Sequence, residues 1–172
     1  MKKRTIILII ICCLVVGVGY VYLCFNPIII HKPYVQNEFL SDSLYNPIDT
    51  VDFTQGENKI IIYTNWTDIR FLPEKIRKWT LLECRDNETI EEVKNNFVFE
   101  RINNDIVETT DFDSRIFFFK NNKLVFQGKF MIEGGISLRF KNTGWTFATN
   151  YNELIRCFSE FKPVCFPIIK ID

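Results

Sequence analysis

The sequence divides into one uninterrupted apolar run and a longer region in which apolar and polar residues alternate. Residues 6–25 (IILIIICCLVVGVGYVYLCF) include no charged side chain. At about 1.5 Å of rise per residue, a helix of this length spans roughly the 30 Å hydrocarbon core of a bilayer. The pattern therefore predicts a transmembrane helix over residues 6–25.

The charges beside this run predict its orientation. Residues 2–4 (Lys-Lys-Arg) precede it, whereas only His31 and Lys32 follow closely. Basic residues concentrate on the cytoplasmic side of membrane helices. We therefore expect residues 1–5 in the cytoplasm, a single-pass anchor in the inner (cytoplasmic) membrane, and the C-terminal domain outside, in an extracytoplasmic or periplasmic position.

A cleaved signal peptide is the alternative interpretation of the same segment. A basic start, an apolar core and small residues at Gly17 and Gly19 would suit cleavage after Gly19. The apolar run, however, continues to Phe25, where signal peptides usually become polar. We therefore favour a retained anchor.

Residues 26–56 show no sustained hydrophobic period. Residues 33–56 mix Asn, Asp, Ser and Pro with scattered aromatic residues, a composition typical of connecting segments. We expect a stalk, or an extended segment that lies over the domain. Residues 57–172 are enough for one domain with its own core and too few for two.

The first half of this domain carries one strand signal and two helix signals. The β-branched run 59–63 (KIIIY) predicts a buried central strand. Pro73 stands where a helix would begin, and apolar residues on one face predict an amphipathic helix over residues 73–83. A second short helix is expected over residues 87–97, because Asn87 can cap it and acidic residues occupy its first turns.

From residue 97 the hydrophobic period changes to two, which predicts antiparallel strands. Residues 97–102 form the first of these strands. Residues 116–119 and 124–126 flank Lys-Asn-Asn-Lys and predict a hairpin, because asparagine tolerates the left-handed backbone of a tight turn. The remaining predicted elements are strands at 130–132, 136–140 and 145–148 and a helix at 150–161. The predicted fold class is α+β: an N-terminal transmembrane helix, then one domain with a mainly antiparallel sheet and two to three helices.

The charge of the outer region argues against nucleic acid as a partner. The chain has 21 basic and 21 acidic residues, but all the acidic residues follow the apolar run and four of the basic ones precede Pro33. The outer region thus carries 17 basic against 21 acidic residues, a net charge of about −4. The 17 phenylalanines favour a strand-rich, aromatic core.

The sequence contains no recognisable catalytic or metal-binding constellation. His31 is the only histidine and follows the apolar run closely, so no Ser-His, Cys-His or multi-histidine site can be assembled within the domain. The carboxylate pairs Glu91 with Glu92 and Asp111 with Asp113 are explained more simply by a helix start and a turn. We therefore expect no catalytic residue, no metal and no cofactor, and binding rather than catalysis.

The six cysteines divide equally between the apolar run and the domain. In an oxidising compartment, Cys84, Cys157 and Cys165 allow one disulfide and one free thiol. Cys157 and Cys165 are the nearest pair along the chain and form the candidate disulfide. Cys84 is an alternative partner for either, and a buried free thiol is the alternative for Cys157.

The order strand, helix, strand, late hairpin and final helix resembles a thioredoxin-like domain over residues 57–161. KIIIYTNW (59–66) is similar to that family's first core strand and the tryptophan after it, and SRIFFFKNNKLVFQG (114–128) is similar to its late hairpin. Where the family carries its redox CxxC, this chain has TDIR at 67–70, and Ser-Arg stands where a cis-proline is expected. The resemblance therefore implies the fold but supplies no attacking thiolate at the usual position.

Three functions fit these observations. The leading hypothesis is an anchored interaction protein that binds or stabilises another envelope protein in an accessory, regulatory or immunity-type role. The antiparallel meander would offer the partner surface if its edge is uncovered, through Phe130, Ile132, Ile136, Leu138 and Phe140. The alternatives are a degenerate thioredoxin-like redox or thiol-carrier protein and a ligand-sensing β-rich domain.

Overall fold

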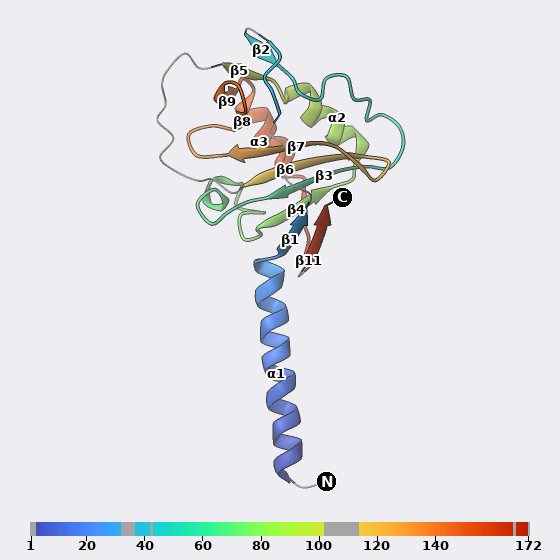
Figure 1. Cartoon of the computed structure of the whole chain (residues 1–172), viewed down its shortest axis with the longest axis vertical. Helices are drawn as coiled ribbons and strands as arrows, with labels where there is room; N and C mark the ends of the chain where they lie inside the picture. The colour runs from blue at the N-terminus through green and yellow to red at the C-terminus, as the bar shows by residue number, and fades with distance from the viewer. Residues whose placement is uncertain (1–2, 32–36, 42, 102–113, 167, 172) are drawn as a thin grey trace.

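A long helix projects from a domain in which two further helices lie beside a large sheet (Figure 1). The computed structural model describes residues 3–31, 37–41, 43–101, 114–166 and 168–171. Over these residues the α-helices are α1 (Lys3–Phe25), α2 (Asn87–Asn96) and α3 (Tyr151–Phe158), and Ile69–Phe71 form a short 3₁₀ turn, η1. The α+β class and the N-terminal apolar helix are confirmed.

Nine strands form one antiparallel sheet in the described part of the chain. The strands are β2 (Leu44–Tyr45), β3 (Asn58–Tyr63), β4 (Leu81–Cys84), β5 (Phe99–Arg101), β6 (Arg115–Lys120), β7 (Lys123–Met131), β8 (Ser137–Phe140), β9 (Gly144–Ala148) and β10 (Lys162–Pro163). Their order across the sheet is β10-β4-β3-β6-β7-β8-β9-β5-β2. Strands β6 to β9 follow one another in sequence and in space, so the predicted meander is confirmed.

The β6–β7 hairpin turns at the two asparagines that predicted it. Asn121 and Asn122 have φ angles of 49° and 60°, in the left-handed region that asparagine tolerates. The Asn121 amide donates a 2.7 Å hydrogen bond to the carbonyl oxygen of Glu57. The turn is thereby fixed to the start of β3.

The helix predicted over residues 73–83 is wrong. The amides of Ile76 and Arg77 both donate to the Pro73 carbonyl oxygen, at 2.9 and 3.0 Å, but the turn does not continue. The chain then extends as β4, which pairs with β3 and β10. Leu82 belongs to the main core and Leu81 to a second cluster on the other side of the sheet, so β4 lacks the alternation that identifies a half-buried strand. Without this helix, the thioredoxin-like arrangement is unsupported.

Helix α2 confirms its prediction, although the capping residue differs. Asp86, rather than Asn87, is the N-cap, and one of its carboxylate oxygens accepts a 2.8 Å hydrogen bond from the Thr89 amide. Ile90 and Val93 on the buried face of α2 pack into the same core as Leu154 of α3. The two helices therefore cover one face of the sheet together.

The segment before β3 contributes to the core of the domain. Phe39, Ile48 and Phe53 are buried in the main cluster with the sheet and both helices. Phe39 packs edge to face on Phe140 of β8, with ring centroids 5.2 Å apart. These isolated apolar residues therefore reach the core from a segment with no regular period, as an extended segment lying over the domain would.

The end of α1 is tied to the domain by side-chain and backbone contacts. The Phe25 ring stacks on Trp79 at a centroid distance of 5.3 Å, and the Thr80 hydroxyl donates a 2.6 Å hydrogen bond to the Phe25 carbonyl oxygen. Strand β1 (Ile28–His31) follows at once and pairs in parallel with the C-terminal strand β11 (Ile168–Ile171). We call this two-stranded sheet the terminal ribbon. Figure 1 shows it at the end of the domain from which α1 emerges.

Candidate functional site

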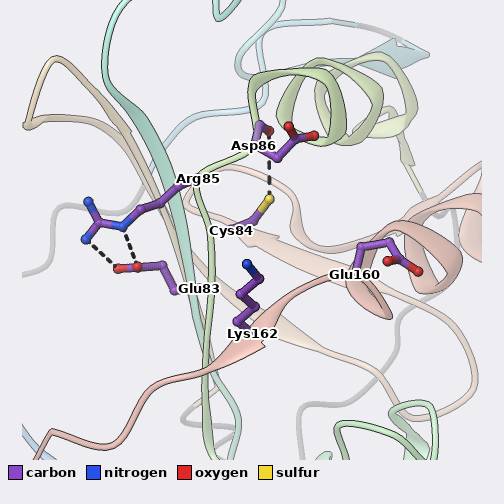
Figure 2. A pocket seen from close by; sticks show the side chains of 6 residues that line it. All are labelled: Glu83, Cys84, Arg85, Asp86, Glu160 and Lys162. Atoms are coloured by element: carbon purple, nitrogen blue, oxygen red, sulfur yellow. Dashed lines mark hydrogen bonds and ion pairs between the residues drawn. The ribbon is translucent and has the colours of Figure 1, made fainter.

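A hollow of about 150 Å³ lies where β4, α2 and β10 meet (Figure 2). It is lined by Glu83, Cys84, Arg85, Asp86, Glu160 and Lys162. The sheet register places Lys162 of β10 directly opposite Glu83 of β4. Arg85 makes a bidentate ion pair with Glu83, in which Nε and Nη2 donate at 2.5 and 3.2 Å. The rim is therefore charged, and its ion pair lies at the surface, where such pairs contribute little stability.

The Cys84 thiol in this hollow is a poor nucleophile. The residue is only 5% exposed, and its Sγ lies 3.8 Å from the Asp86 carbonyl oxygen. Burial raises the pKa of the Cys84 thiol above its ordinary value, so the thiolate is scarce at neutral pH. The hollow offers no chemistry of the kind that a thiol carrier needs.

The candidate disulfide between Cys157 and Cys165 is not formed, and all six cysteines are free. Cys157 lies on the buried face of α3, where burial raises the pKa of its thiol to about 11. Cys165 is exposed in the segment after β10. The buried free thiol that was the alternative for Cys157 is the arrangement observed.

The residues expected at an exposed edge of the meander are instead in the core. Strand β8 lies between β7 and β9, so it has no free edge. The candidate residues Phe130, Ile132, Ile136, Leu138 and Phe140 are each at most 1% exposed. The expected interaction edge is therefore wrong. The alternation that identified these strands also marks the face that packs against α3 and against Phe39, Ile48 and Phe53.

Among the described residues the sheet ends at β2 on one side, and exposed apolar side chains lie there. Leu44 of β2 is 52% exposed and Leu40, just before it, is 72% exposed. Figure 1 places β2 at the end of the domain opposite α1. Sequence reasoning missed both leucines, because an isolated leucine in an aperiodic segment carries no signal of whether it is buried.

A buried carboxylate joins three loops of the domain. Asp68 is inaccessible to solvent; it accepts a 2.5 Å hydrogen bond from the Ser114 hydroxyl and a 2.9 Å bond from the Ile132 amide. Burial raises the pKa of the Asp68 carboxyl. The structure thus brings together Asp68 of TDIR and Ser114, which are 46 residues apart in the sequence. These bonds hold the loop after β3 against the residue before β6 and the residue after β7.

The carboxylate pair Glu91 and Glu92 has structural partners. Glu91 accepts a 2.5 Å hydrogen bond from the Phe53 amide, and Glu92 pairs with Arg156 of α3. Asp111 and Asp113 lie outside the described residues. Within the described ranges, no group of three His, Cys, Asp or Glu side chains could hold a metal ion.

No family model, curated protein or solved structure matches the chain. Two features at opposite ends of the molecule bear on its function. One is α1, in which Arg4–Phe25 is long and apolar enough to cross a membrane. The other is the pair of exposed leucines beside β2.

Proposed function

We propose that this chain is a single-pass membrane protein whose domain binds another envelope protein outside the cytoplasm. The apolar face of α1 is not covered by the domain, and a helix of this composition is stable in lipid because all its backbone groups are bonded internally. Residues 2–4 are basic, which favours a cytoplasmic N-terminus and an extracytoplasmic domain in the inner membrane.

The observation that carries the binding role is the exposed apolar edge at β2. Burying one leucine side chain in an interface is worth about 1.5–3 kcal/mol, so Leu40 and Leu44 together are costly to leave in water. Strand β2 pairs on one side with β5 and ends the sheet on the other. An edge strand with exposed apolar neighbours is a surface to which a partner protein can add.

Binding fits the described residues better than either alternative function. The thiols of Cys84 and Cys157 are buried, with raised pKa values, which disfavours thiol exchange. The hollows around α2 are lined mainly by charged and amide side chains, unlike the apolar cavity of a small-molecule sensor.

Site-specific cross-linking in native membranes tests the proposal. A photo-reactive amino acid in place of Leu44 should give a discrete adduct with one protein, which survives detergent solubilisation and purification of the full chain. The same amino acid in place of Val125, an exposed apolar residue of β7, is the matched control and should give none. Leu40→Glu should abolish the adduct at position 44. Recovery of the full chain alone from both positions would contradict the binding role.

A further inference from the structure

The segment between β10 and β11 is held beside the last turn of α1 at both of its ends. At one end, the Val164 amide donates a 3.1 Å hydrogen bond to the Leu81 carbonyl oxygen. Leu81 follows Thr80, whose hydroxyl holds the Phe25 carbonyl oxygen. At the other end, Ile168 pairs with Ile28, three residues beyond Phe25. Val164 and Ile168 therefore both lie close to the point where α1 enters the domain.

The parallel pairing of the terminal ribbon sets the direction of this segment. Strand β1 leaves α1 and runs into the domain, and β11 runs the same way beside it. Ile168 is therefore at the end of β11 that lies toward α1, as Ile28 is at that end of β1. Figure 1 shows β11 beginning level with the end of α1. Phe166 lies within about 7 Å of Ile168, because an extended chain advances at most about 3.6 Å per residue.

The side chains at this end of the ribbon are apolar and exposed. Phe166 is 62% exposed and Ile168 is 56% exposed, and Ile28 and Ile30 of β1 are also exposed. Tyr22 in the last turns of α1 is exposed as well. Aromatic and apolar side chains at this depth are typical of the boundary between hydrocarbon and lipid headgroups.

We propose that Phe166 and Ile168 insert into the outer interface of the bilayer that holds α1, so that the terminal ribbon is a second membrane contact. The occupant is the lipid surface itself, because β11, which begins at Ile168, lies at the end of the domain from which the exposed apolar helix α1 emerges. This inference rests on the proposed anchoring by α1. Contact at two places would fix the tilt of the domain and direct β2 away from the membrane.

Fluorescence quenching by spin-labelled lipids tests this contact in the full chain. Cys165 is exposed next to Phe166, whereas Cys24, Cys84 and Cys157 are buried, so Cys165 can be labelled selectively once Cys12→Ala and Cys13→Ala are introduced. The protein carries an environment-sensitive fluorophore on Cys165 in phosphatidylcholine–phosphatidylglycerol vesicles with nitroxides at headgroup depth. The control carries the same label on Leu44→Cys in a Cys165→Ser background.

The expected result is quenching at Cys165 at least about twofold stronger than at the β2 control, because only the first label sits in the interface. Phe166→Asp with Ile168→Asp should reduce it to the control level, and Phe166→Trp should preserve it. Equal quenching of the labels at positions 165 and 44, in protein that stays in the membrane on alkaline extraction, would overturn the ribbon contact. It would leave the anchoring by α1 intact. Protection of the Cys165 label from quenching that increases with the protein-to-lipid ratio would also overturn the ribbon contact. It would indicate that a second copy of this chain, rather than lipid, covers the ribbon. Release of the protein by alkaline extraction would instead count against anchoring by α1.

Discussion

At the residue scale, the least expected feature of the domain is a carboxylate without solvent access. Asp68 is held by the Ser114 hydroxyl and by the Ile132 amide, which belong to segments far apart in sequence. A buried polar group that loses one such partner costs roughly 1–3 kcal/mol. The network therefore fixes the loop after β3 against the start of β6 and the end of β7.

Replacing this carboxylate should change how stability depends on pH. Burial raises the pKa of Asp68, so its contribution to the free energy of unfolding is fully present below the ordinary value of 3.8 and is lost as pH rises through the raised pKa. The stability of wild type relative to Asp68→Asn should therefore fall as pH increases across that interval. Urea unfolding of the full chain in detergent, followed by near-UV circular dichroism at several pH values, measures this difference.

An exposed aspartate provides a control of opposite sign. Hydrogen bonds from Thr54 lower the pKa of Asp52, so the stability it contributes is present above 3.8 and is lost as pH falls through the lowered pKa. Wild type should therefore gain stability relative to Asp52→Asn as pH rises. For each variant, the stability of wild type relative to that variant is plotted against pH. Slopes of the same sign for Asp68→Asn and Asp52→Asn would contradict the conclusion that burial raises the pKa of Asp68.

At the element scale, the accuracy of sequence-based prediction depends on how local each signal is. The β6–β7 hairpin and α2 were predicted well, because Asn121-Asn122 and the acidic first turn lie within the elements that they specify. Strand β4 was missed, because it is covered on both faces and its apolar residues lack a period. The segment before β3 could not be predicted for a different reason. Phe39 and Leu44 are both isolated apolar residues in it, yet Phe39 is buried and Leu44 is exposed. Contacts with residues distant in the sequence decide which of them is buried.

The turn of the hairpin gives a direct test of this local control. Asn122 has a φ angle of 60°, which alanine adopts at a cost of about 1 kcal/mol and glycine adopts freely. Asn122→Ala should therefore lower the free energy of unfolding by about that amount, whereas Asn122→Gly should lower it by less. Chemical denaturation of both variants is the measurement, with Lys123→Ala, an exposed strand residue, as the control. Equal stability of the alanine and glycine variants would show that the left-handed backbone does not govern the turn.

At the scale of the whole molecule, most of the exposed large apolar side chains among the described residues lie at opposite ends, and Trp66 in the loop after β3 and Val125 of β7 are the exceptions. Helix α1 and the terminal ribbon form one end, and Leu40 with Leu44 beside β2 forms the other (Figure 1). Helices α2 and α3, with Phe39, Ile48 and Phe53 of the segment before β3, cover one face of the nine-stranded sheet between these ends. This arrangement suits a domain held against a membrane that presents its far end to a partner.

The most direct test of this account is the accessibility of the β2 end to a membrane-impermeant maleimide. Leu44→Cys is introduced into the full chain after Cys12, Cys13 and Cys165 are replaced by serine, because the other cysteines are buried. In intact spheroplasts, position 44 should be labelled as completely as after permeabilisation, on protein that stays in the membrane fraction at alkaline pH. Labelling only after permeabilisation, or a product recovered in the soluble fraction, would contradict an anchored domain outside the cytoplasm.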